Sequence, residues 1–187
     1  VCFTISANLS GTYNAAVMGR EMVLEEHPET KMVYITSPTY DGVVSDVEQI
    51  AEVVHRRKLP LIVDEAHGAH FPFSEQFPKD SVSCGADVVI HSVHKTLPSL
   101  TQTALIHLNG DLINREKIRY FLGVYQSSSP SYVMMAGIDQ CMEWVSSHRK
   151  EFDSFAQRLQ EVRRRSGLTQ EQFAERLCVS RQAVSKW

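Results

Sequence analysis

Hydrophobic residues along this chain occur in two patterns: short continuous runs, and longer stretches with helical spacing. Runs such as LIV and VVI are typical of strands covered on both faces, whereas apolar residues three or four positions apart are typical of amphipathic helices. The predicted strands are Met32–Thr36, Leu61–Asp64, Asp87–His91 and Ala104–Leu108. The predicted helices are Tyr13–Glu26, Asp46–Arg57, Arg115–Leu122 and Ser131–Val145. Alternating strands and helices predict an α/β fold with parallel strands and right-handed crossovers.

The helix predicted from Asp46 has a recognisable start. Ser45 followed three residues later by Glu48 forms a capping-box pattern, in which each side chain bonds to the other residue's backbone N–H. We therefore expect Ser45 to cap this helix.

Polar residues gather where three of the predicted strands end. The sequence SPTYDG follows the first strand, DEAHGAH contains the end of the second, and SVHK follows the third. In open α/β sheets, ligands bind at the carboxyl ends of the strands. We therefore expect any functional site of this chain to lie at that edge of the sheet.

Asp64 and Lys95 stand out within this group. A lysine in such a place is ordinarily a solvated surface residue, and an acid beside an amine can be a structural ion pair. The same two side chains could instead anchor pyridoxal 5'-phosphate. Lys95 would then form a Schiff base with its aldehyde, while Asp64 kept the pyridine nitrogen protonated. The small Ala66 would let the ring approach the backbone, and His67 and His94 could donate to the phosphate or the substrate.

Composition excludes several classes of protein. The chain has 187 residues, of which 43% are hydrophobic, enough for a buried core. Its apolar runs are too short to span a membrane, and the N-terminus has no export pattern, so we expect a cytoplasmic protein with no membrane partner. Four cysteines without CxxC spacing argue against a metal site or a disulfide framework, and they are expected to be reduced.

Three runs of sequence occur in order: ITSPTYDGVVSDVEQIAEVVHRRKLPLIVDEAHGAHFPF, GADVVIHSVHKTLPSLTQTALIHL and YQSSSPSYVMMAGID. Together they resemble the large domain of the bacterial ornithine/lysine/arginine decarboxylases, which are fold-type I pyridoxal-phosphate enzymes. The resemblance covers about residues 29–143. It implies a partial fold-type I large domain at 29–150, with a mostly parallel sheet and flanking helices.

The resemblance also implies roles for individual residues. Lys95 corresponds to the cofactor lysine and Asp64 to the partner of the pyridine nitrogen, and with His67 they form the candidate catalytic group. The implied cofactor-binding residues are Asp64, Ala66, His67, Ser92, His94 and Lys95. His91 stands where an uncharged amide is expected.

The first segment, residues 1–28, differs from this family. Its sequence TISANLSGTYNAAVMGREMVLEEHPE resembles the DegV-type fatty-acid-binding proteins. Ser10, Gly11 and Thr12 open the predicted helix, so their backbone N–H groups could bind an anion. An ordinary Ser/Thr/Gly helix start explains the same residues.

The tail, residues 157–187, is basic. Its sequence QRLQEVRRRSGLTQEQFAERLCVSRQAVSKW resembles a truncated Cro/repressor-type helix-turn-helix. From Gln157 onward, 7 Lys and Arg face 3 Asp and Glu, a balance of +4 within a chain of net charge −3. Thr169 with Gln172 is expected to cap a helix that runs to Leu177, and Ser180 a second helix that is cut short. The candidate DNA-binding residues are Gln170, Arg181, Gln182, Ser185 and Lys186. A plain amphipathic hairpin with a solvated basic face is the alternative.

These resemblances imply a decarboxylase of ornithine, lysine or arginine that uses pyridoxal 5'-phosphate and forms a homodimer if it folds. Because each resemblance is partial, we expect a fusion or fragment with weak cofactor binding and weak or no activity. A DNA-binding regulator, with the α/β part as sensor or dimerisation module, is the alternative, and a non-functional fragment is a third possibility.

Overall fold

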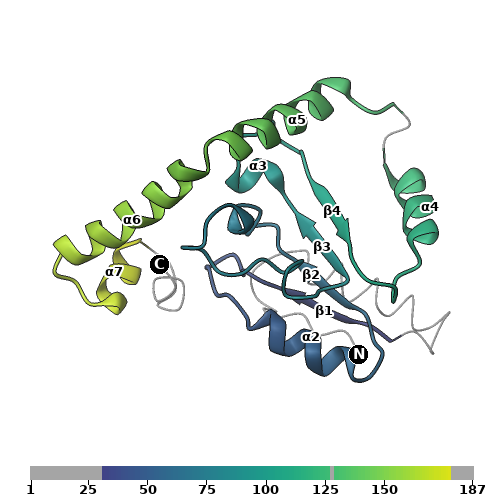
Figure 1. Cartoon of the computed structure of the whole chain (residues 1–187), viewed down its shortest axis with the longest axis horizontal. Helices are drawn as coiled ribbons and strands as arrows, with labels where there is room; N and C mark the ends of the chain where they lie inside the picture. Colours follow the sequence, from purple (N-terminus) through teal and green to yellow (C-terminus); the bar gives the residue numbers. More distant parts are fainter. Residues whose placement is uncertain (1–30, 127–128, 178–187) are drawn as a thin grey trace.

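The computed structural model describes residues 31–126 and 129–177 (Figure 1). Within them, one sheet contains the strands β1 (Val33–Thr36), β2 (Leu61–Asp64), β3 (Val88–His91) and β4 (Leu105–Leu108), in that order. The helices are α2 (Val47–His55), the 3₁₀ helix η1 (Phe71–Phe73), α3 (Val93–Thr96), α4 (Arg115–Tyr125), α5 (Tyr132–Ser147), α6 (Arg149–Arg165) and α7 (Gln170–Leu177). The α/β fold is confirmed. The helix predicted at Tyr13–Glu26 lies outside the described residues.

The sheet is parallel except at β4. Strands β1, β2 and β3 run the same way, and Asp64 is paired with Thr36 on one side and Ile90 on the other. Strand β4 runs antiparallel to β3, with His91 opposite Leu105, so the expectation of parallel pairing is wrong for this strand. The segment that joins β3 to β4 explains this direction. Parallel neighbours are usually joined by a helix that returns the chain along the strand, and the four-residue α3 in this segment is too short for that.

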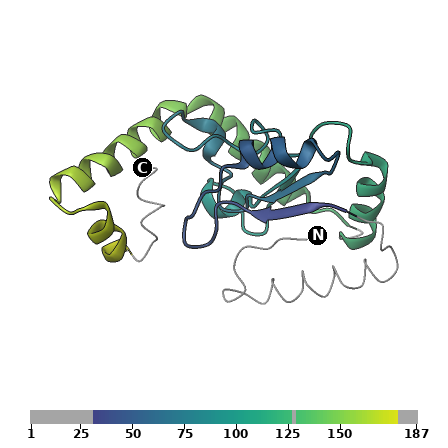
Figure 2. The same ribbon diagram turned by 90° about the horizontal axis from the view of Figure 1, so that it is seen from below.

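Helix α2 covers one face of the sheet (Figure 2). Val47, Ala51 and Val54 of this helix are buried against strand residues that include Val63 and Val89. Because burying each of these side chains removes apolar surface from water, this cluster fixes the register of the parallel strands.

The start of α2 differs from the prediction. Asp46, not Ser45, is the N-cap, and its carboxylate accepts from the Gln49 backbone N–H at 3.1 Å and from the Gln49 amide at 2.7 Å. The Ser45 N–H donates instead to Ser37 Oγ at 3.0 Å. Aspartate and serine are equally good N-cap residues, so the sequence alone could not decide whether the helix is capped by Ser45 or Asp46.

Helix α5 packs on the segment that follows β3. Cys141 and Val145 are buried with Val93 and Leu97 of that segment. Gly137 of α5 permits the approach, because a Cβ atom there would lie 3.0 Å from the Leu100 side chain. Figure 1 shows α6 continuing from α5 and leading α7 away from the sheet.

Cys84 and Cys141 are free thiols, as expected, and burial raises the pKa of both. Cys2 and Cys178 lie outside the described residues. Among the described residues, no His, Cys, Asp and Glu cluster could hold a metal ion, and no helix is long and apolar enough to cross a membrane.

The predicted cap of α7 is confirmed. The Thr169 N–H donates to Gln172 Oε1 at 3.0 Å, and the Gln172 N–H donates to Thr169 Oγ1 at 3.2 Å. Phe173 and Ala174 are buried and pack with Leu168. Of the candidate DNA-binding residues, Gln170 is the first residue of α7. The others, Arg181, Gln182, Ser185 and Lys186, lie outside the described residues, as does the predicted second helix.

Candidate active site

The candidate site lies where β2 and β3 end. Asp64 is the last residue of β2, and it is paired with Ile90 of the parallel strand β3. The Glu65 N–H donates to the Ile90 carbonyl at 3.0 Å, which extends the pairing beyond the strand. Ser92 then starts the short helix α3, which carries His94 and Lys95. The expectation that the two strands end side by side is confirmed.

Lys95 contacts a histidine from the turn after β2. Its Nζ lies 3.1 Å from His67 Nε2. A lysine ammonium can only donate, so His67 Nε2 accepts and the imidazole proton is on Nδ1. Burial lowers the pKa of His67, the charge of Lys95 lowers it further, and that of Asp64 opposes the change. These effects keep His67 neutral at pH 7, the state that this contact requires.

Asp64 is oriented by two donors. Its Oδ1 accepts from the Ala66 backbone N–H at 3.1 Å, and its Oδ2 accepts from the Tyr34 hydroxyl at 3.2 Å. No ion pair between Asp64 and Lys95 is present in the described part of the chain. The structural ion pair considered from the sequence is therefore not formed between these two described residues.

The other predicted site residues are close in sequence but differ in their contacts. Ala66 is buried at the turn. Ser92 is half-buried at the start of α3, where its side chain makes no capping bond. His94 Nδ1 donates to the Thr103 carbonyl at 2.8 Å, so this ring is fixed to the loop before β4 and makes no hydrogen bond to Lys95. Ser92 thus remains able to donate to a ligand, and His94 can offer only Nε2.

Three residues near the site were missed by the sequence reasoning. Tyr34 orients Asp64. Its place on the strand predicted next to Asp64 is the sequence feature that could have identified it. The Tyr40 ring lies 5.7 Å from that of His67, edge to face, and is 79% exposed. Glu65 is almost fully buried beside the site. A second carboxylate directly after Asp64 was a visible sign that one of the two must turn inward, because successive side chains of an extended chain face opposite ways.

These residues suit pyridoxal phosphate in part. Lys95 offers an exposed amine, and Asp64 offers a fixed carboxylate at the end of the adjacent strand. A phosphate group needs several N–H or O–H donors, and Ser92 is one such donor. The described residues therefore fit the aldehyde and the pyridine nitrogen better than the phosphate.

Comparison with known proteins identifies the family of the chain. The family model described as Orn/Lys/Arg decarboxylase, major domain, matches residues 11–184. The chain belongs to this family. The match extends into the segments 1–28 and 157–187. The resemblances expected there, to the DegV-type proteins and to a helix-turn-helix, stay predictions.

Several relatives are similar to parts of the chain. An arginine decarboxylase of Bacillus subtilis (strain 168) is 33% identical over 147 residues, which are 79% of this chain and 30% of that protein. The uncharacterized protein YaaO of the same organism is 44% identical over 123 residues, or 65% of this chain and 26% of that protein. The chain therefore spans less than a third of the length of these relatives.

A solved structure shows the same fold. Cystathione gamma lyase (CalE6) from Micromonospora echinospora has a TM-score of 0.53 and 17% identity, covering 78% of this chain and 42% of that chain. At this identity, the likeness concerns the fold alone.

Proposed function

We propose that this chain is the cofactor-lysine part of a pyridoxal-phosphate-dependent decarboxylase of a basic amino acid. The observation that carries the proposal is the contact of Lys95 with His67 at 3.1 Å, beside the strand that ends in Asp64. Membership of the Orn/Lys/Arg decarboxylase family supports it. Arginine is the substrate to test first, because the arginine decarboxylases are 31–33% identical, whereas a lysine decarboxylase (LdcA) of Pseudomonas aeruginosa is 25% identical.

When bound, pyridoxal phosphate supplies a ring that accepts electrons from the carbon that loses CO₂. The chain's own residues then have distinct tasks. Lys95 would hold the cofactor through its aldehyde, and neutral His67 accepts a hydrogen bond from the Lys95 amine and so orients it. Asp64, whose carboxylate is fixed by Tyr34 and Ala66, would keep the pyridine nitrogen protonated. Ser92 is placed to donate to the phosphate.

Absorbance titration with pyridoxal phosphate tests this proposal. We expect a visible band from covalent attachment in the wild-type chain, and its loss in Lys95→Ala. Lys117→Ala is the matched control, because Lys117 is an exposed lysine of α4. Borohydride reduction followed by peptide mass spectrometry then identifies the modified lysine, and modification elsewhere would overturn the proposal. Release of CO₂ from arginine, lysine and ornithine, compared between wild type and Lys95→Ala, identifies the substrate.

DNA binding by the segment 157–187 is a second candidate function. The observation that favours it is the reciprocal bonding of Thr169 and Gln172 at the start of α7, as expected for the first helix of a helix-turn-helix. A gel-shift titration at low and high salt tests it. We expect salt-sensitive binding with little sequence preference, because contacts to phosphates dominate such binding. Failure to shift any duplex at low salt would exclude it.

A further inference from the structure

A buried carboxylate lies directly behind the candidate site. Glu65 is 2% exposed, although it is adjacent in sequence to Asp64. A buried carboxylate is costly unless hydrogen bonds replace its water, and Glu65 accepts several. They come from the Ser81 N–H at 3.1 and 3.2 Å, the Ser81 hydroxyl at 2.6 Å and His91 Nε2 at 2.6 Å. Glu65 thus joins the turn after β2 to the segment before β3 and to the end of β3.

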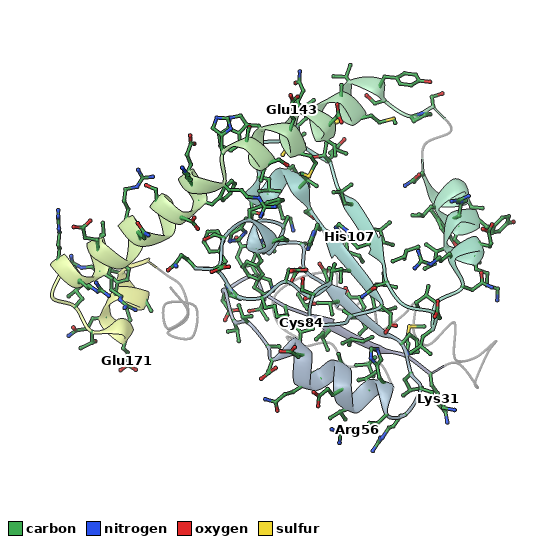
Figure 3. All side chains as sticks on the ribbon, in the orientation of Figure 1. Lys31, Arg56, Cys84, His107, Glu143 and Glu171 are labelled. Atoms are coloured by element: carbon green, nitrogen blue, oxygen red, sulfur yellow. The ribbon has the colours of Figure 1, made fainter. Side chains whose placement is uncertain are left out.

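His91 extends this network to β4. An ionised carboxylate accepts only, so His91 Nε2 carries a proton, and His91 Nδ1 lies 3.0 Å from Nε2 of His107, which Figure 3 labels. A neutral His91 accepts this second bond, whereas a protonated His91 donates it. The two hydrogen bonds of His91 therefore hold its ring between Glu65 and His107.

Few other ionisable groups face this network in the described residues. Burial, and then the charge of His91, lower the pKa of His70 to about 4. Burial and then His91 lower the pKa of His107, while Asp80 opposes the change. Glu65 is the one acid in direct contact with His91. His91 is therefore flanked by one carboxylate and by two rings that stay neutral at pH 7.

The turn that carries His67 is wound tightly around Glu65. The Gly68 N–H donates to the Glu65 carbonyl at 2.8 Å. A Cβ atom at position 68 would lie 2.5 Å from Glu65 Cγ and 2.9 Å from the Phe71 ring, so only glycine fits. His67 lies between Glu65 and Gly68 in the chain, so its position depends on where Glu65 is held.

We propose that Glu65 is a positioning residue, which keeps His67 in contact with Lys95. Its anchors are Ser81 and His91. The role of Lys95 as the reactive amine rests on the proposed function. The contact between Lys95 and His67 can be measured without any cofactor.

NMR titration of the histidines in the cofactor-free chain tests the proposal. Glu65→Gln keeps the shape and removes the charge, and Glu75→Gln is the control because Glu75 is exposed. In Glu65→Gln we expect the pKa of His67 to rise towards 6.5, the ordinary value, because the ring leaves Lys95 and its buried position. Glu75→Gln should leave it unchanged. A folded Glu65→Gln chain with the wild-type His67 titration would overturn the proposal.

A second pair of variants at position 91 keeps the test decisive if Glu65→Gln does not fold. His91→Gln can donate to Glu65 and accept from His107, whereas His91→Ala can do neither. The readout is the rate at which a limiting amount of acetic anhydride labels Lys95 relative to Lys117, measured by mass spectrometry. We expect His91→Ala to change this ratio about twofold or more at pH 7 and His91→Gln to restore it. Equal ratios in all three chains at pH 7 would overturn the proposal.

The same variants separate this inference from the proposed function. If the wild-type chain binds no pyridoxal phosphate but Glu65→Gln shifts the His67 titration, the positioning role stands and the proposed function fails. If pyridoxal phosphate binds at Lys95 but Glu65→Gln leaves His67 unchanged, the proposed function stands and the positioning role fails.

Discussion

Lys95 Nζ lies 3.1 Å from His67 Nε2, and only the imidazole of this pair can accept the hydrogen bond. The contact therefore exists only while His67 is neutral. Burial and the charge of Lys95, which lower the pKa of His67, preserve the contact at pH 7.

Replacing His67 should weaken attachment of the cofactor without abolishing it. In His67→Ala, Lys95 loses one hydrogen bond, worth about 1 kcal/mol, so pyridoxal phosphate should bind about fivefold to tenfold more weakly. Absorbance titration measures this change. His148→Ala, which removes a histidine at the end of α5, is the control. Equal affinity in His67→Ala and wild type would show that this contact does not matter for binding.

His70 should make the fold sensitive to acid. Its pKa is lowered to about 4 in the folded chain, so below the ordinary value of 6.5 the unfolded chain binds more protons. Stability should therefore fall as pH drops from about 6.5 to 4, by roughly 3 kcal/mol from this residue. Urea unfolding at pH 7 and pH 4.5 measures the loss. His70→Phe, which cannot ionise, should reduce it, and an unchanged pH dependence would contradict this assignment.

Packing of α5 should account for a measurable part of the stability. Val145 is fully buried, so Val145→Ala should lower the free energy of unfolding by about 2 kcal/mol. Val133 lies in the same helix and is 71% exposed, so Val133→Ala should change the stability by less than about 0.5 kcal/mol. Equal effects of the two changes in chemical denaturation would show that α5 does not pack as described.

A methyl group at position 68 should disturb both stability and site. Gly68→Ala places a Cβ atom against Glu65 and Phe71, and such overpacking costs about 1–3 kcal/mol. Gly123→Ala in α4 is the matched control, because nothing lies within 4 Å of its Cβ position and alanine is the better helix former, by up to about 1 kcal/mol. The midpoint temperature of thermal unfolding should therefore fall in Gly68→Ala and rise in Gly123→Ala. A shift in the same direction would contradict the tight turn.

Much of this fold was predictable because its strands are short apolar runs with helices between them. The strand Leu61–Asp64 was predicted to the residue, and the end of β3 at His91 likewise. The direction of β4 was not predictable from the hydrophobic pattern, since an apolar run has the same pattern in either direction. The length and content of its connection to β3 decide the direction, and α3 is only one turn long.

The place of the candidate site was predictable in part, and the roles of its residues stay predictions. Asp64 stood out because it ends an apolar strand, and Lys95 because it follows the next one. These strands are neighbours in the sheet, but Lys95 lies in α3 and not at the end of β3. The partners Tyr34 of Asp64 and Ser81 of Glu65 were not visible. They come from segments distant in sequence whose approach depends on the tertiary packing. His91 was noticed only as a departure from an expected amide, and its bond to Glu65 gives the physical meaning of that departure.

The fit between Gly68 and Glu65 has a consequence for sequence variation among relatives. Because a Cβ atom at position 68 would occupy the space of the Glu65 stem, the two positions are expected to change together. A chain with a shorter residue at 65 can tolerate alanine or serine at 68, whereas one that keeps glutamate at 65 is restricted to glycine. Paired substitution at these positions would then mark lineages in which the turn beneath His67 has been rebuilt.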